Sequence, residues 1–250
     1  MKSRTTNYAP AYRQNWHRDD SCRVSIVLAG ALAEETRRSS IVAAPLDIVI
    51  KSHRIKHENR FGPSGARLFS TKIDPTWLSI LPSATGQLDW IWLQARHGCH
   101  LAMSLLDSAA RKDHNGLESL IIETLAWASH AKAKTGKKGA LHRELRLLRE
   151  QVLDDLNSVV NVGTAARNMG LHPVYLARAY RETFGLSIQD DRQLRRIKLS
   201  TEFLSMPEKT IAEVAQEMDF FDQSHFSRVF KRYTGTTPGK YRAHMMALAV

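Results

Sequence analysis

The spacing of hydrophobic residues changes along the chain and divides it into three regions. Up to about residue 74, short apolar runs alternate with glycine and proline, as is typical of strands joined by turns. The predicted strands cover residues 22–28, 40–44, 46–50 and 67–73. These runs predict a small β-barrel or sandwich at the N-terminal end.

Residues 87–133 follow a helical period instead. A first predicted helix carries Leu88, Ile91, Trp92, Leu101, Leu105 and Leu106, and a second carries Leu117, Leu120, Ile121 and Leu125. We expect the break between them at residues 114–116. Their apolar stripes suit packing on the β-domain and a dimer interface equally well, because periodicity does not distinguish the two uses.

A polar, basic and glycine-containing segment at residues 134–140 has nothing to bury and predicts a domain linker. After it the chain is helical throughout, beginning with a leucine stripe on residues 141–156. We therefore expect an α+β protein of two domains. Residues 1–133 form a β-barrel with a helical appendage, and residues 141–250 form an all-α domain.

The second domain contains one helix-turn-helix pattern twice, offset by 50 positions. This offset relates Leu176 to Phe226, Arg178 to Arg228, Tyr180 to Phe230, Arg181 to Lys231, Gly185 to Gly235 and Arg192 to Arg242. A repeat of this length is one supersecondary element used twice. A short helix, a tight turn and a second helix with a basic polar face are typical of proteins that read DNA.

Capping residues mark the ends of the predicted helices. Thr210 and Glu213 form a capping box, and Asn161 caps the equivalent helix of the first copy. Asp222, Ser187 and Thr237 are predicted caps of later helices, and Gly185 and Gly235 end the two recognition helices. Asp219 occupies a turn position that favours the left-handed conformation, which Asp tolerates better than most residues.

The outer faces of the two recognition helices carry different chemistry. Arginine can bind guanine through two hydrogen bonds, and glutamine can bind adenine in the same way. The predicted base-reading residues are Val174, Ala177 and Arg178 on the first helix, and Gln223, Ser224, Ser227 and Arg228 on the second. Arg181 and Lys231 lie later on each helix and are expected to hold phosphates. The second helix should therefore contribute more of the hydrogen-bonded readout.

A longer motif spans the second copy and the helix after it. It consists of Ala215, Asp219, Phe220, Asp222, Ser224, Phe226, Arg228, Phe230, Lys231, Gly235, Thr237, Pro238, Tyr241 and Arg242. This motif resembles the AraC/XylS family of bacterial transcription regulators. The resemblance implies two helix-turn-helix units joined by a long helix at residues 187–204, which read successive major-groove segments. It also implies a cytoplasmic homodimer that acts on promoter DNA with RNA polymerase, as an activator rather than a repressor.

The N-terminal region is similar to the cupin-type sensing domain of many such regulators, through Pro45, His57, residues 59–63 and His17. The resemblance implies a small-molecule effector inside the barrel, with His17, Arg23 and His57 as candidate polar contacts. Leu46 replaces the usual glycine, and the second histidine and the glutamate of the motif are missing. His17, His53 and His57 could offer three nitrogens to a metal ion, but their spacing gives no further support. We expect no metal, no cofactor and no catalytic residue.

The amino-acid composition limits the kinds of binding partner and cellular setting that are expected for the chain. The net charge of +11 favours an anionic partner such as nucleic acid. Only 16 of the 36 basic residues, but 13 of the 25 acidic ones, lie from Leu141 onward, so the pattern rather than the bulk charge marks the DNA-reading domain. No apolar run approaches the ~18 residues of a membrane span, and no secretory signal is expected. Cys22 and Cys99 are too few for a disulfide framework.

Three functions stay open on the sequence alone. The first is a DNA-binding regulator controlled by an unknown effector. The second is an effector-independent regulator whose N-terminal half only dimerises. The third is a metal-dependent cupin enzyme that carries a DNA-binding tail.

Overall fold

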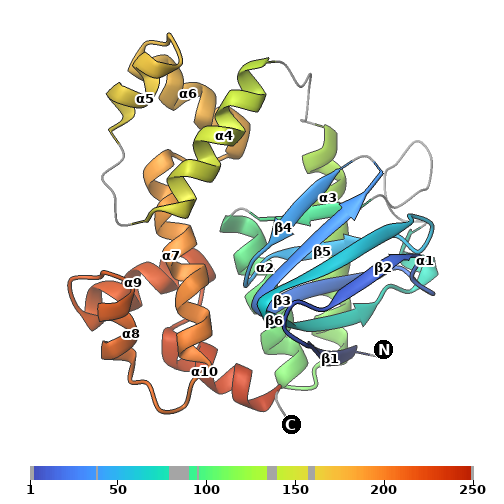
Figure 1. The fold of residues 1–250 in the computed structure, drawn as a ribbon. Coiled ribbons are helices and arrows are strands. Elements are labelled where there is room, and N and C mark those ends of the chain that lie inside the picture. The colour runs from blue at the N-terminus through green and yellow to red at the C-terminus, as the bar shows by residue number, and fades with distance from the viewer. Residues whose placement is uncertain are drawn as a thin grey trace. The chain divides into compact units, whose positions relative to one another are not determined.

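The structure is a computed structural model that describes residues 3–37, 39–78, 90–94, 96–133, 140–156 and 161–248. An antiparallel sheet in the N-terminal part is followed by a helical C-terminal part (Figure 1). The strands are β1 Ser3–Tyr8, β2 Arg13–His17, β3 Arg23–Thr36, β4 Ser40–Ala43, β5 Ile48–Lys51, β6 His57–Lys72 and β7 Ile91–Leu93. The helices are α1 Pro75–Leu78, α2 Arg96–Ala110, α3 His114–Ala133, α4 Ala140–Asp154, α5 Val162–Asn168, α6 Pro173–Phe184, α7 Ile188–Leu204, α8 Ile211–Glu217, α9 Gln223–Thr234 and α10 Pro238–Ala247. The expected linker lies outside the described residues up to Ala140, where α4 begins.

The sheet is built around two long strands, β3 and β6. Its order is β1-β6-β3-β5-β7, while β2 also pairs with β6 and β4 with β3, and every pairing is antiparallel. The buried side chains of one hydrophobic cluster in this part are Val27, Leu32, Ala43, Val49, Phe61, Ala66, Leu68 and Trp90. The four predicted strands are therefore present as β3 to β6, although β3 and β6 extend well beyond the expected bounds.

Two glycines shape the pairing of β3 with β6. Gly30 and Gly65 have φ angles of +70° and +77°, and a Cβ atom on Gly30 would lie 2.1 Å from the Gly65 carbonyl oxygen. The register of the two strands shifts close to Gly30. Because a side chain at Gly30 would collide with backbone, glycine is required at this irregularity.

The prediction of a helix over Ile91 and Trp92 is wrong. Ile91–Leu93 forms the edge strand β7, which pairs with Ile48–Ile50 of β5, and the helix begins only at Arg96. A short apolar run has no periodicity that separates a strand from a helix, and here the neighbouring strand decides. The expected break at residues 114–116 is also misplaced, since Lys112 has a left-handed φ of 57° and α3 already begins at His114.

The apolar stripes of α2 and α3 are buried within this chain. Leu101, Leu105 and Leu106 of α2 and Leu117, Ile121 and Leu125 of α3 are at most 4% exposed, and the two helices contact each other. Intramolecular packing, one of the two uses left open by the sequence, is confirmed. Among the described residues, no helix is long and apolar enough to cross a membrane.

The chain forms two compact units. One comprises Thr135–Ile197, and the other combines Met1–Lys134 with Lys198–Val250. Within the larger unit, α2 contacts α9 and α10: His100 Nε2 lies 3.2 Å from the Arg232 carbonyl oxygen, and His244 Nε2 lies 2.8 Å from Asp107 Oδ1. This grouping by contacts differs from the expected domain boundary, which stays a prediction.

Candidate functional site

The first helix pair, α5 and α6, is defined at both ends by capping side chains. The Asn161 carboxamide oxygen accepts a hydrogen bond from Thr164 N at 3.0 Å, as predicted. His172 caps α6 by accepting from Val174 N at 3.3 Å, and Pro173 occupies the first turn. Gly185 ends α6 with a φ of 73°, so the glycine supplies the left-handed residue that this helix end needs.

The second helix pair, α8 and α9, repeats this frame with stronger caps. Thr210 and Glu213 form the predicted capping box, in which Thr210 N donates to the Glu213 carboxylate at 2.7 Å. Asp222 accepts from His225 N at 2.6 Å, and Gly235 ends α9 with a φ of 79°. Asp219 has a φ of 57°, which confirms the left-handed turn residue.

The offset between the two pairs is not constant. The first helices, α5 and α8, are related by 49 positions, whereas α6 and α9 are related by 50, so the turn of the second pair holds one extra residue. Gly170 and Asp219 adopt the matching left-handed conformation, and Leu171 N and Phe220 N make matching bonds to Ala166 O and Ala215 O. The extra residue is therefore Phe221, which is 93% exposed.

The outer face of α6 combines apolar side chains with two arginines. Val174 is 71% exposed, and Ala177, Arg178 and Arg181 are exposed as well. Arg178 Nε donates to Glu182 Oε1 at 2.7 Å, and this carboxylate raises the pKa of Arg178. The single arginine predicted to read bases from α6 is thus engaged by a neighbour on its own helix.

The outer face of α9 is polar. Gln223, Ser224 and Arg228 are exposed, and Ser227 is half-buried between them. In the described part of the chain no acidic side chain pairs with Arg228. Lys231 follows on the last turn of the helix and is also exposed. All four predicted base-reading side chains of this helix therefore lie on one accessible strip.

The interiors that orient the two helices differ. Behind α6, the buried Asp191 accepts from Tyr180 Oη at 2.8 Å and from Arg149 Nε at 2.6 Å, which joins α4, α6 and α7. Burial and the Asp191 charge both raise the pKa of Tyr180. Behind α9, the equivalent positions are Phe230 and Tyr241, whose ring centroids lie 5.7 Å apart. One helix is held by a charged network and the other by aromatic packing.

Two equivalent arginines brace both pairs. Arg192 of α7 donates to the Leu156 carbonyl oxygen. Arg242 of α10, 50 positions later, donates to the carbonyl oxygens of Leu204 and Lys209 at 3.0 and 2.6 Å. Both side chains bind backbone just before a helix pair, so this part of the repeat has a structural role.

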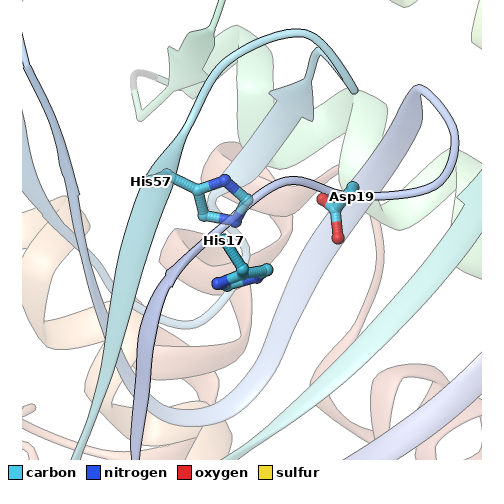
Figure 2. A group of neighbouring side chains, drawn as sticks. All are labelled: His17, Asp19 and His57. Atoms are coloured by element: carbon cyan, nitrogen blue, oxygen red, sulfur yellow. The ribbon is translucent and has the colours of Figure 1, made fainter.

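The effector candidates His17 and His57 lie side by side on the paired strands β2 and β6 (Figure 2). They are register partners in β2 and β6, with ring centroids 4.2 Å apart. Burial, together with the nearby Lys51 charge, lowers the pKa of His57 to about 4, so its imidazole is neutral near pH 7. The third candidate, Arg23, forms ion pairs with Asp20 at 2.6 Å and with Asp19 at 3.6 Å, and Asp19 lies close to the two histidines.

Several polar residues beside the histidines carry no signal in the sequence pattern. The ligand atoms of Asp19, His17 and His57 lie within 4.8 Å of one another. Glu34 is buried in an ion pair with Lys51 and accepts from Trp90 Nε1 and Trp92 Nε1 at 3.0 and 3.1 Å. Trp90 packs on the His57 ring, with centroids 4.3 Å apart. Asp19, Glu34 and Lys51 lie outside the four strands predicted from the sequence, so no local pattern marked them as buried charges that need a partner. His53 lies apart from this group and contacts Cys22 Sγ at 3.1 Å.

Residues 165–244 match a family model described as a helix-turn-helix domain. The arabinose operon regulatory protein of Salmonella typhimurium is 34% identical over 87 residues, which are 35% of this chain and 31% of that protein. The Msm operon regulatory protein of Streptococcus mutans is 27% identical over 126 residues, 50% of this chain and 44% of that protein. Regulatory protein SoxS of Escherichia coli is 29% identical over 89 residues, 36% of this chain and 83% of that protein. The match thus spans about a third of the arabinose regulator.

Among solved structures, ToxT from Vibrio cholerae with bound unsaturated fatty acid aligns over 96% of this chain and 94% of that chain, with a TM-score of 0.41 and 13% identity. The C-terminal domain of AraT, a response regulator from Geobacillus stearothermophilus, aligns over 42% and 88%, with a TM-score of 0.36 and 26% identity.

Proposed function

We propose that this chain is a DNA-binding transcriptional regulator of the AraC type and that it reads DNA through two helix-turn-helix units, α5–α6 and α8–α9. The match of residues 165–244 to a helix-turn-helix family model supports this proposal. The observation that carries this proposal is the repeated frame of caps, left-handed turn residues and bracing arginines behind two accessible helices. Each recognition helix enters the major groove, which is about 12 Å wide and admits an α-helix.

The base contacts are divided between the two helices. On α9, Arg228 binds guanine and Gln223 binds adenine, while Ser224 and Ser227 accept or donate single hydrogen bonds. On α6, Val174 and Ala177 contact thymine methyl groups, and Arg178 binds guanine once its guanidinium turns away from Glu182. Arg181 and Lys231 hold phosphates and contribute affinity without sequence preference.

The N-terminal domain, residues 1–133, controls this activity by binding a small molecule. Its cupin-like sheet holds a buried polar group, Glu34, Lys51 and His57, of the kind that orients a ligand. Residues 134–140 link it to the DNA-binding domain, residues 141–250. We further propose a homodimer that activates transcription with RNA polymerase.

A buried ion pair joins the sheet to α7 within the larger unit and offers a route for such control. Lys198 Nζ donates to Asp47 Oδ1 and, at 2.9 Å, to the Gln94 carbonyl oxygen. Asp47 also accepts from Ala44 N at 2.8 Å, at the turn before β5. A ligand that moves this turn would change the position of α7, the helix that joins the two helix-turn-helix units.

The proposal is tested by footprinting the full chain across genomic DNA and then comparing two variants on the strongest site. Arg228→Ala should relax the preference at one base pair, whereas Lys231→Ala should weaken every sequence about equally and lower the salt dependence. Equal losses on specific and random DNA for Arg228→Ala would overturn the base-reading assignment. Effector control is tested separately by small-molecule thermal shifts, which an effector-independent regulator would lack.

A further inference from the structure

Three side chains at one end of the β2–β6 pair lie close together (Figure 2). His17 ends β2, Asp19 follows it by two residues, and His57 begins β6. One ligand atom from each lies within 4.8 Å of the other two. Two imidazoles and a carboxylate are a donor set that suits first-row transition ions.

Both histidines are oriented so that the same ring nitrogen remains available. Nδ1 of His17 lies 2.7 Å from the Asn15 carbonyl oxygen, and Nδ1 of His57 lies 3.2 Å from the Ile55 carbonyl oxygen. Because a carbonyl oxygen can only accept, Nδ1 carries the proton in each ring and Nε2 has a free lone pair. Metal-binding histidines are usually fixed in this way by a second hydrogen bond.

Two of the donor atoms have no other use in the described part of the chain. Nε2 of His57 and Oδ2 of Asp19 are buried and have no hydrogen-bond partner there, and the His57 residue is 0% exposed. Buried polar atoms are almost always satisfied, so two unpartnered ones within the same cluster of residues indicate a binding partner for that cluster. Arg23 lies 3.6 Å from Oδ1 of Asp19, the other carboxylate oxygen. The charge of Arg23 is balanced by Asp20, at 2.6 Å.

We infer that His17, Asp19 and His57 bind one divalent transition-metal ion such as Zn²⁺, with Nε2 of each imidazole and Oδ2 of the carboxylate as ligands. Donors around a tetrahedral zinc lie roughly 3.4 Å apart, so small side-chain rotations bring the three atoms into place. Three protein ligands leave a coordination position for water or for a small molecule with an oxygen or nitrogen donor.

The test uses the full chain, stripped of metal with a chelator and titrated with Co²⁺ and Zn²⁺. Cobalt bound to this site should give visible d–d absorption that saturates at one equivalent, and zinc should displace it. His17→Ala and Asp19→Asn should each weaken the affinity at least tenfold. The matched control is His53→Gln, a histidine of the same domain outside the cluster, which should bind cobalt like the parent protein.

Thermal unfolding of each metal-free variant separates loss of the site from loss of the fold, because His17 and Asp19 are only half-buried. Added zinc should raise the melting temperature of the parent protein and of His53→Gln, but not of the two site variants. No stoichiometric binding by the parent, or unchanged binding by both site variants, would overturn the inference. DNA binding is measured independently, so failure here leaves the proposed function untouched.

Discussion

The two helix pairs share the same caps and turn residues, but their recognition helices differ in the side chains on the buried side and on the exposed side. The recognition helix of the first pair, α6, rests on the charged network of Tyr180, Asp191 and Arg149. The recognition helix of the second pair, α9, rests on aromatic rings that pack edge to face. On the exposed side, α6 carries a valine, an alanine, Arg178 in an ion pair with Glu182, and Arg181, whereas α9 carries a polar strip. Caps and turn residues therefore determine the shape of the unit, and the exposed positions determine what it can bind.

The largest expected effect is a loss of stability when the charged network behind α6 is removed. Asp191→Ala leaves the Tyr180 hydroxyl and the Arg149 guanidinium without their shared acceptor, which should cost about 3 kcal/mol of unfolding free energy. The value lies at the low end of the range for buried pairs, because the Arg149 side chain is 25% exposed and can reach water. Chemical denaturation of the parent, Asp191→Ala and the exposed control Gln189→Ala measures this. A loss no larger than that of the control would contradict the role of the network.

The next effect contrasts the two arginines. Arg228→Ala should cost roughly 1–3 kcal/mol on the cognate site. Arg178→Ala should cost less, because Arg178 must first give up an exposed ion pair worth about 0.2–1 kcal/mol. Binding isotherms for both variants, repeated in a Glu182→Gln background, sharpen the contrast. If the Arg178 contribution does not grow when Glu182 is neutralised, the ion pair does not limit readout by α6.

A smaller effect separates the helix caps. Asp222→Ala removes a 2.6 Å cap bond and should lower stability by about 1 kcal/mol. His172→Ala removes a bond of 3.3 Å and should cost less, while His172→Asp should stabilise the protein, since Asp is a preferred cap. Thermal melting temperatures of the three variants rank their stabilities. A larger loss for His172→Ala than for Asp222→Ala would contradict the stronger cap at Asp222.

The smallest effect tests the turn residues. Asp219 and Gly170 have φ angles of 57° and 64°, a region where a side chain adds strain. Asp219→Gly should be close to neutral, and Gly170→Ala should destabilise by about 1 kcal/mol. Thermal melting curves of Asp219→Gly and Gly170→Ala, each compared with the parent protein, measure the two changes in stability. Equal shifts in the same direction would argue against a shared left-handed turn.

Local chemistry explains why so much of the C-terminal region could be predicted. The caps Asn161, Thr210 and Asp222 and the terminating glycines act within a few residues of their own position, so sequence alone identifies them. The helix-turn-helix pattern was predicted for the same reason. The missed detail, the extra turn residue Phe221, leaves the spacing of the two recognition helices unchanged and so cannot be seen from their offset.

Features that depend on distant partners were not predictable. β1 and β2 have few apolar residues and form only because both pair with the long β6. β7 is a strand because β5 lies beside it. The approach of Asp19 and His17 to His57 requires the β2–β6 register, which joins residues 40 positions apart. No local sequence pattern specifies which strands pair or in which register.

Sequence-specific DNA binding is measured most directly by a competition assay with the full chain at about 0.15 M salt. Labelled DNA carrying the site selected by footprinting is challenged with unlabelled selected DNA and with a scrambled duplex of equal length and composition. If α6 and α9 read base sequence, the selected duplex competes at least a thousandfold better than the scrambled duplex. Equal competition by the two duplexes would contradict sequence-specific binding by α6 and α9.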